Sequence, residues 1–207
     1  MAQDAGFFTD EIVPVEIPQR KMDPIVFDTD EFPRGNTTME SLGGLRAAFK
    51  KDGSVSAGNS SGLNDGAAAL LIASNEAIQA HDLKPLARVV SSAVAGVEPR
   101  IMGIGPVAAS NKALERAGLS LDDMDILEMN EAFSAQVLAC TRALGIADDD
   151  PRINPNGGAI SLGHPLGMSG SRILLTAARQ LNRTNKRYAL VTTVSYTHLT
   201  LPTIHRV

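Results

Sequence analysis

His164 stands in the segment of this 207-residue chain that is richest in chemical possibilities. Glycines and prolines surround it in Asn154–Gly170 (NPNGGAISLGHPLGMSG), with Gly163 and Pro165 on either side of the imidazole. Rigid, small neighbours hold a side chain in place and leave room for a substrate. Histidine is also the most common general base near neutral pH. On this segment alone, a catalytic histidine and a structural one both stay open.

Asn130 is the second candidate, in Met129–Phe133 (MNEAF), where a strand is expected to end and a helix to begin. Asparagine there can cap the helix by accepting backbone hydrogen bonds, and this is the interpretation that the sequence favours. The alternative is that its amide projects into a site at the carboxyl end of the strand, where α/β folds bind ligands. Glu131 suits the first helical turn in either case.

Two glycine-rich turns offer backbone amides to a ligand. Ser56–Gly66 (SAGNSSGLNDG) leads into an alanine-rich stretch, and Arg100–Pro106 (RIMGIGP) precedes another expected helix. Such turns can hold an anion at a helix N-terminus, but plain connecting turns look the same. The dinucleotide fingerprint and the phosphate-binding lysine motif do not occur, which disfavours an unrelated nucleotide-binding module.

The remaining reactive side chains point to no further site. Cys140 lies in an alanine- and leucine-rich stretch and is expected to be an inert core thiol. His81, at the end of an expected helix, is explained by a favourable C-terminal charge. The four histidines are scattered, without the spacing of a metal site, so no metal is expected.

Composition limits the class of protein. Hydrophobic residues make up 43% and charged residues 20%, as in globular proteins, which excludes wholesale disorder. With a net charge of −4 and no basic stripe, nucleic-acid binding is not expected. The apolar run Ala67–Ala73 is too short to cross a membrane, and the start of the chain shows no signal peptide. A single cysteine fits a reducing compartment, so we expect a cytoplasmic protein.

The expected elements alternate between strands and helices from Pro85 onward, which predicts an α/β layered domain there. Residues 1–60 form a weakly periodic excursion, with an irregular loop at Asp23–Asn36. The predicted strands are Glu11–Ile17 at an edge, Leu86–Val97, Asp125–Met129 and Tyr188–Val194. The predicted helices are Thr38–Phe49, a buried helix at Asn64–Ala80, Pro106–Ala117, Glu131–Leu144 and Met168–Leu181.

Taken together, these segments resemble the thiolase family, the CoA-dependent acyltransferases that make or cleave 3-oxoacyl-CoA. The resemblance rests on NEAF at Asn130–Phe133, NGGAxxxGHPxGxSG at Asn156–Gly170 and SAGNSSGLNDGAA at Ser56–Ala68, in that family's order and spacing. It extends from about residue 2 to Thr193. Within the family, the sequence most resembles the 3-oxoadipyl-CoA thiolases of aromatic degradation, followed by acetoacetyl-CoA and fatty-acid thiolases.

The resemblance implies a layered α/β fold in which two similar halves pack together and an inserted loop domain covers CoA. Residues 1–58 then resemble the end of the loop domain, and residues 59–85 resemble the last helix of the first half. Residues 86–193 resemble the second half. Residues 194–207 match nothing in the family.

The resemblance also implies a role for each matching residue. His164 corresponds to the histidine that activates the nucleophilic cysteine, and Asn130 to the asparagine that holds a water in an oxyanion hole. Ser61 matches a serine that contacts the pantetheine of CoA, while Met102 and Phe133 match residues that line that pocket. CoA is thus a substrate here, and no permanently bound cofactor is implied.

Two departures from the family are expected to matter. The family's nucleophilic cysteine lies in the first half, and its second catalytic cysteine follows the strand that matches Ala189–Thr193. Here Val194–Val207 (VSYTHLTLPTIHRV) contains neither cysteine nor glycine. We expect this change to mark a frameshift or an assembly junction rather than a variant tail or a fusion scar, and Met1 to be an internal start of a longer reading frame.

The expected function is therefore thiolytic cleavage of 3-oxoacyl-CoA, such as 3-oxoadipyl-CoA to succinyl-CoA and acetyl-CoA, or the reverse condensation. An acetyl-CoA acetyltransferase or a β-oxidation thiolase is the alternative within the family. Without its thiols the chain is expected to be inactive alone, so a CoA-binding or subunit-binding fragment is the alternative of another class. The full-length parent is expected to bind acyl-CoA, to form a homo-oligomer, either a dimer or a tetramer, and to bind neither nucleic acid nor membrane.

Overall fold

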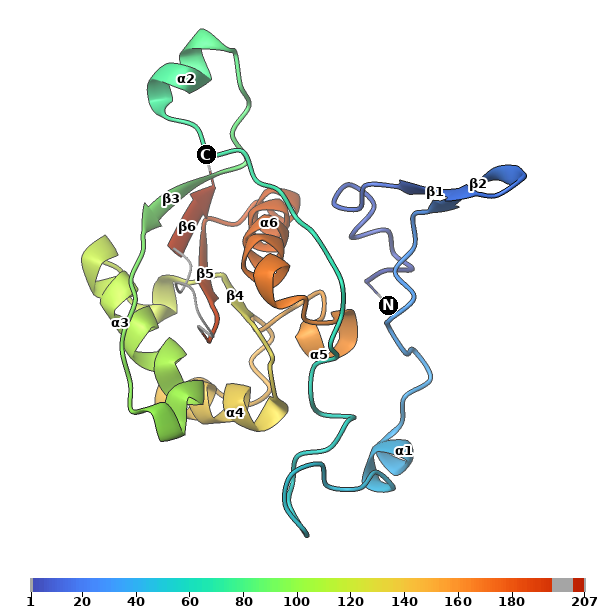
Figure 1. The fold of residues 1–207 in the computed structure, drawn as a ribbon. Coiled ribbons are helices and arrows are strands. Elements are labelled where there is room, and N and C mark those ends of the chain that lie inside the picture. Colours follow the sequence, from blue (N-terminus) through green and yellow to red (C-terminus); the bar gives the residue numbers. More distant parts are fainter. Residues whose placement is uncertain (1, 195–202, 207) are drawn as a thin grey trace.

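The structure, a computed structural model, describes residues 2–194 and 203–206 (Figure 1). Its main sheet has four strands in the order β3-β6-β5-β4. These are β3 (Ala87–Ser91), β4 (Ile126–Met129), β5 (Tyr188–Thr192) and β6 (Thr203–Arg206). Strands β4 and β5 are parallel, whereas β6 runs antiparallel to both β3 and β5.

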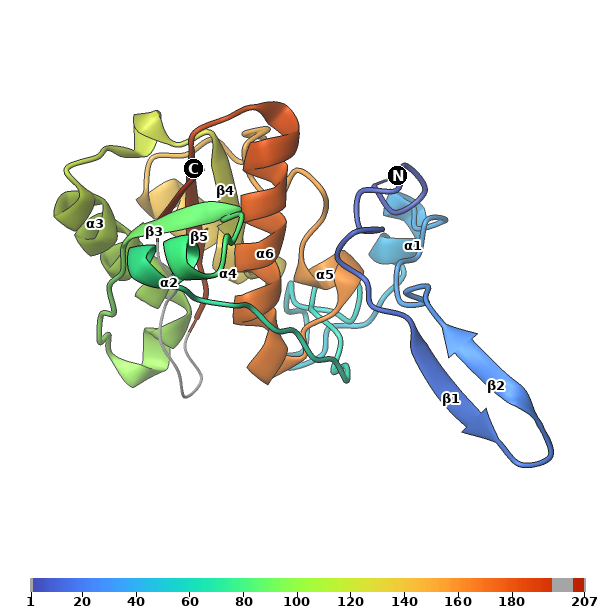
Figure 2. The same cartoon turned by 90° about the horizontal axis from the view of Figure 1, so that it is seen from above.

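Helices cover both faces of this sheet (Figure 2). Helix α6 (Leu166–Thr184) packs on one face, where Ile126 and Val191 meet Ile173. Helix α3 (Gly105–Ala117) lies on the other face, where Leu127 and Leu190 pack with Leu114. Adjacent residues of β4 therefore point to opposite faces, as a strand buried on both sides requires. The α/β layering predicted from Pro85 onward is confirmed.

Shorter elements connect these layers. Helix α4 (Ser134–Ala143) follows β4 on the α3 side, where Val137 and Cys140 pack with Met129. The 3-10 helix η1 (Pro99–Ile104) leads into α3, and η2 (Leu121–Asp123) leads into β4. Helix α5 (Ala159–Leu162) is a single turn that comes just before α6.

Residues 2–85 form an excursion from this domain (Figures 1 and 2). Strands β1 (Val15–Gln19) and β2 (Met22–Phe27) make a two-stranded antiparallel hairpin, followed by the short helix α1 (Met39–Gly43) and, much later, α2 (Asn75–Ala80). The edge strand predicted near Glu11–Ile17 is confirmed, shifted toward its C-terminal end. The loop predicted at Asp23–Asn36 is wrong in its first part.

Strand β2 forms although Pro24 has no backbone N–H to donate to the neighbouring strand. Apolar pairs across the hairpin stabilise it instead. Val15 pairs with Phe27 and Ile17 with Ile25, and such apolar cross-strand pairs stabilise antiparallel strands. Both strands are edges, where proline is tolerated.

The predicted buried helix at Asn64–Ala80 is wrong. Only Asn75–Ala80 is helical, with Ser74 as its N-cap, and residues 61–74 form an extended segment without regular secondary structure (Figure 1). Leu71 is 82% exposed and Ile72 is 74% exposed. Helices of this length depend on packing of an apolar face, and within the described part of the chain nothing covers these side chains.

Three other elements also differ from the prediction in their bounds. Helix α4 begins at Ser134 rather than Glu131, and its N-cap is Phe133. Strand β3 ends at Ser91, six residues earlier than expected. The helix predicted at Thr38–Phe49 is limited to α1, which starts with the Thr38–Ser41 capping box and ends at the Gly43–Gly44 pair.

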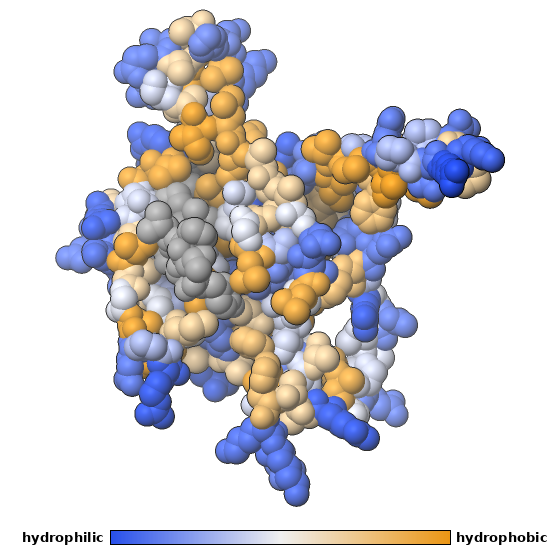
Figure 3. Space-filling view, viewed as in Figure 1, coloured by the Kyte–Doolittle hydropathy of each residue, from blue (hydrophilic) through white to orange (hydrophobic). Residues whose placement is uncertain are grey.

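The surface view shows apolar patches over the hairpin and beside the extended segment that leads to α2 (Figure 3). Among the described residues, no helix is both long and apolar enough to cross a membrane. A final strand through Thr197–Leu201, one interpretation of the C-terminal tail, lies outside the described residues.

Candidate active site

Asn130 and His164 meet at the carboxyl end of β4. The Nδ2 atom of Asn130 lies 3.3 Å from Nε2 of His164, and both side chains are buried. The backbone N–H of Asn130 donates to the carbonyl of Thr192, which extends the β4–β5 pairing by one residue. Asn130 is therefore not the cap of α4, so the favoured interpretation was wrong. The amide instead points toward the imidazole of His164 at the strand end, and its role toward a ligand stays a prediction.

Ser169 fixes which nitrogen of His164 carries the proton. Its hydroxyl donates to the Pro165 carbonyl at 3.0 Å, so Oγ accepts from Nδ1–H of His164 at 2.7 Å. The lone pair of Nε2 then faces Asn130. Burial, followed by repulsion from Arg172, lowers the pKa of His164. The site thus contains a neutral imidazole whose Nε2 can accept a proton.

The loop that carries His164 is fixed by a contact from a distant segment. The His164 backbone N–H donates to Oδ1 of Asn64, at 3.2 Å. Gly163 adopts φ +90, and a Cβ there would lie 2.6 Å from that same oxygen. Glycine is therefore required beside the histidine, both for the left-handed backbone and for the approach of Asn64.

A second network ties the Asn130 loop to the His164 loop through Glu131. One carboxylate oxygen of Glu131 accepts from Nδ2 of Asn154 (2.7 Å), and the other accepts from the backbone N–H of Ile160 (3.1 Å). Asn154 also bonds both backbone groups of Met129. A Cβ on Gly158 would collide with the Glu131 carboxylate. Sequence reasoning gave Glu131 only a helix-dipole role, and the asparagines within NPNGG were the available signal.

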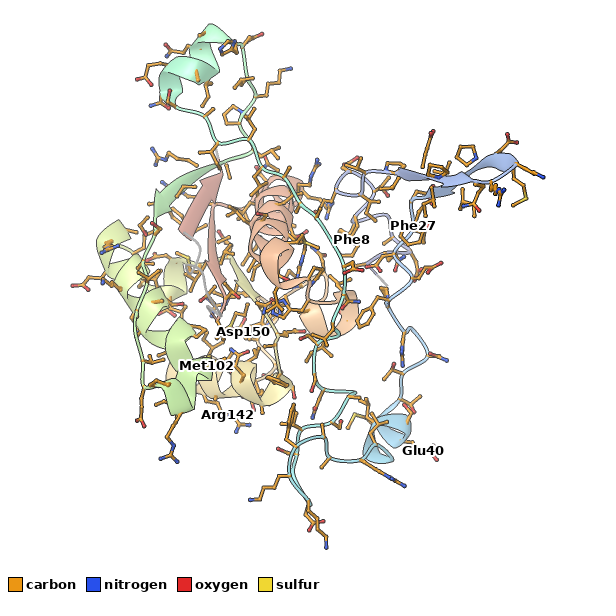
Figure 4. The ribbon with its side chains drawn as sticks, in the orientation of Figure 1. Phe8, Phe27, Glu40, Met102, Arg142 and Asp150 are labelled. Carbon is orange, nitrogen blue, oxygen red and sulfur yellow. The ribbon has the colours of Figure 1, made fainter. Side chains whose placement is uncertain are left out.

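Ser61 and Phe133 lie side by side at the entrance to α4. Both the N–H and the hydroxyl of Ser61 donate to the carbonyl of Ala132, at 3.0 and 3.2 Å. The Phe133 ring meets Phe49 edge to face, with centroids 5.9 Å apart. Met102 comes from a separate element, η1, which packs beside α4 (Figure 4). The structure joins Asn130 to His164 and Ser61 to the Phe133 turn, with Met102 on the neighbouring element.

A surface groove of about 420 Å³ runs along the His164 loop. It is lined by Asn64–Ala68 on one side and Pro165–Met168 on the other. A Cβ on Gly66 would press against Pro165 and Met168, so glycine lets the two walls approach each other.

Cys140 lies on the other face of β4, packed with Met129, and takes no part in the Asn130–His164 contact. It is fully buried within α4, and its thiol donates to the Gly103 carbonyl at 3.3 Å. Burial raises the pKa of the thiol, which disfavours the nucleophilic thiolate. The prediction of an inert core cysteine is confirmed.

Two family models match the chain almost from end to end. The thiolase N-terminal domain matches residues 1–76, and the thiolase C-terminal domain matches residues 83–198. The chain belongs to the thiolase family. Its predicted thiolase-type fold is also that of its solved relatives.

Relatives with known names support this assignment. The chain is 59% identical to a beta-ketoadipyl-CoA thiolase of Acinetobacter baylyi, over 91% of this chain and 47% of that protein. It is 56% identical to the 3-oxoadipyl-CoA/3-oxo-5,6-dehydrosuberyl-CoA thiolase of Escherichia coli, over 92% of this chain and 48% of the relative. The chain thus spans about half the length of the curated relatives it matches.

Solved structures give the same picture. The acetyl-CoA acetyltransferase of Bacillus anthracis superposes with a TM-score of 0.94 at 44% identity, covering all of this chain and 52% of that one. Human mitochondrial 3-ketoacyl-CoA thiolase in complex with CoA gives 0.90 at 47% identity, covering 99% of this chain and 50% of the other.

Proposed function

We propose that this thiolase chain supplies the histidine–asparagine part of an acyltransferase centre that cleaves 3-oxoacyl-CoA with CoA. The observation that carries the proposal is the buried Asn130–His164 pair, in which a neutral imidazole faces an amide donor at 3.3 Å. The names of the curated relatives support 3-oxoadipyl-CoA as the substrate.

The proposed chemistry divides between the two side chains. A cysteine thiol gives its proton to Nε2 of His164, and the resulting thiolate attacks the 3-oxo carbonyl carbon. Attack on the carbonyl carbon turns the carbonyl oxygen into an oxyanion. Asn130 donates its amide hydrogen toward this oxyanion, directly or through a water molecule. When this adduct collapses, the bond between C2 and C3 breaks, and the acetyl-CoA that leaves takes a proton at C2 from the family's second catalytic cysteine. The thiol of CoA then displaces the first cysteine from the acyl group.

Cys140 cannot be the nucleophilic thiol, because it is buried in α4 and its pKa is raised. The nucleophile therefore comes from thiolase sequence that this chain does not contain.

The proposed CoA path runs past Ser61, Met102 and Phe133. Support comes from the position of Ser61 against the Phe133 turn and from η1 packing beside α4. We also propose the segment limits 1–58, 59–85, 86–193 and 194–207 described above. A cytoplasmic location and a homo-oligomeric full-length parent complete the proposal.

A second function is favoured by one observation, the inaccessible Cys140. A chain whose single thiol is buried has no nucleophile for thiolysis, so the isolated chain is proposed to be a CoA-binding or subunit-binding fragment.

The test uses a chimera that supplies the missing parts. Residues 1–193 replace the matching segment of the Acinetobacter baylyi relative, and thiolysis of 3-oxoadipyl-CoA is measured. His164→Ala and Asn130→Ala are each expected to lower kcat by ~100-fold or more, because each removes a group that acts on the reacting atoms. His81→Ala, at the C-cap of α2, is the control and should keep full activity. Full activity in His164→Ala would refute the proposed role.

A further inference from the structure

The face of α6 that contacts His164 also carries a buried arginine, Arg172. Ser169, Arg172 and Thr176 follow one another at intervals of three and four residues, so they share one side of the helix. Ser169 binds the imidazole of His164, and the hydroxyl of Thr176 donates to Oε2 of Glu11 at 2.8 Å. Arg172 stands between these two contacts.

Strand β4 presents the matching side. Glu128 and Asn130 are two residues apart and therefore point to the same face, the face that packs on α6. Asn130 meets His164, and Oε2 of Glu128 lies 3.8 Å from Nη1 of Arg172. Two neighbouring contacts thus join β4 and the residue after it to α6 and the loop before it. The first is between the Asn130 amide and the His164 imidazole, and the second is between the Glu128 carboxyl and the Arg172 guanidinium.

The guanidinium of Arg172 is held away from water among three carboxyl groups. Glu128 on β4 is fully buried, Glu11 comes from the N-terminal segment, and Glu131 follows β4. All three act on Arg172 when they are ionised, and ionised carboxylates partly offset the cost of burying a guanidinium. Burial raises the pKa of Glu128 to about 8, so below that pH Glu128 faces Arg172 as a neutral carboxyl. The same positive charge acts on His164 and disfavours its protonation.

We propose that Arg172 is a positioning residue for this site: its buried guanidinium, one turn along α6 from the Ser169 that binds His164, opposes protonation of the imidazole and so helps to leave Nε2 open to accept a proton. Glu128 and Glu11 keep the guanidinium on this face of α6. The inference rests on the proposed function, because it assigns Arg172 a task toward the same histidine.

The test follows the titration of His164 itself. In the 207-residue chain, deuterium exchange at the imidazole C2–H, read by mass spectrometry across a pH series, gives the midpoint for each histidine. Arg172→Met should raise the His164 midpoint by about 0.5 to 1 pH unit, because a nearby like charge has been removed. A midpoint within about 0.2 units of the parent chain, below what loss of a close charge produces, would overturn the proposal.

The matched control is Arg179→Met, the same substitution two turns further along α6. Arg179 lies near Asp10, at 3.6 Å, so this variant should leave the His164 midpoint unchanged. A purely structural arginine at 172 would alter stability without moving the histidine titration. An equal shift in both variants would therefore also count against a specific role for Arg172.

If Arg172→Met fails to fold because Glu128 is left unpaired, Glu128→Gln/Arg172→Met removes both members of the pair, a change that buried pairs tolerate better. The double variant should raise the His164 midpoint as well, and an unchanged midpoint refutes the proposal. The titration needs no substrate, so it separates the two claims. An active His164→Ala chimera refutes the proposed function alone, whereas an unmoved titration refutes the role of Arg172 alone.

Discussion

Residues 86–194 and residues 2–85 contrast in how they bury apolar surface. In the first region β4 and β5 are covered on both faces, by α6 on one side and by α3 and α4 on the other. In the second region the hairpin and the extended segment expose large apolar side chains. They include Val13, Val15, Met22, Ile25, Val26, Leu63, Leu71 and Ile72. The comparison shows that a sequence pattern predicts a helix or strand well where other parts of the same chain cover its apolar side chains.

The largest expected difference in stability is between two leucine-to-alanine substitutions, one in each region. Leu181→Ala in α6 removes a fully buried side chain and should lower the free energy of unfolding by ~2–5 kcal/mol. Leu71→Ala, at an 82% exposed position, should change it by less than ~0.5 kcal/mol. Urea unfolding followed by circular dichroism measures both. Equal losses would show that residues 61–74 are packed in solution and would break the comparison.

The next largest difference in stability is expected between two glycine-to-alanine substitutions near the candidate site. Gly158→Ala forces a methyl group into the Glu131 carboxylate, and we expect a loss of ~1–3 kcal/mol in unfolding free energy. Gly167→Ala lies in α6 with nothing within 4 Å and should be neutral or stabilising. Thermal unfolding of the two variants decides this. A harmless Gly158→Ala would mean that Glu131 does not bridge the two loops.

The sequence predicted the parts of the molecule whose partners lie within the chain. Strands β4 and β5 and helices α3 and α6 were placed to within a few residues, because their apolar residues face each other across the sheet. His164 and Asn130 were both found, but their contact was not predictable from spacing because it joins two loops 34 residues apart. Hydrogen bonds between distant segments, such as those of Glu131 and Asn154, leave no periodic signal.

The helix predicted at Asn64–Ala80 failed for a related reason. Alanine propensity favours a helix, but propensity alone stabilises a short helix poorly. Asn64, the expected cap, accepts instead from the His164 backbone. The exposed Leu71 and Ile72 leave apolar surface open, so the isolated chain is expected to self-associate. Sedimentation of the purified chain tests this, and a monodisperse monomer would contradict it.

A smaller effect should appear in the pH dependence of stability. Burial raises the pKa of Glu128 from 4.5 to about 8 in the folded chain. The folded state therefore retains a proton that the unfolded state releases above pH 4.5. This contribution to stability is complete below that pH and is lost as the pH rises through about 8. Glu128→Gln, which stays neutral, should lose less stability over this window.

Melting temperatures at about pH 5 and pH 8 measure that difference, which we expect to reach ~3 °C in favour of Glu128→Gln at the higher pH. Both proteins retain His164, so its own titration cancels in the comparison. Asp149→Asn, at an exposed position, is the control and should follow the parent chain. Parallel pH curves for parent and Glu128→Gln would show that Glu128 is ionised in the folded chain.

The most direct test of the central claim, that this chain brings the histidine and asparagine of a thiolase centre without its thiols, compares thiolysis of 3-oxoadipyl-CoA by two proteins. One is the purified 207-residue chain, and the other is the chimera that adds the remaining thiolase segments around residues 1–193. The account predicts turnover by the chimera and none by the chain alone. Turnover by the isolated chain, or a folded chimera that binds CoA but does not turn over, would contradict it.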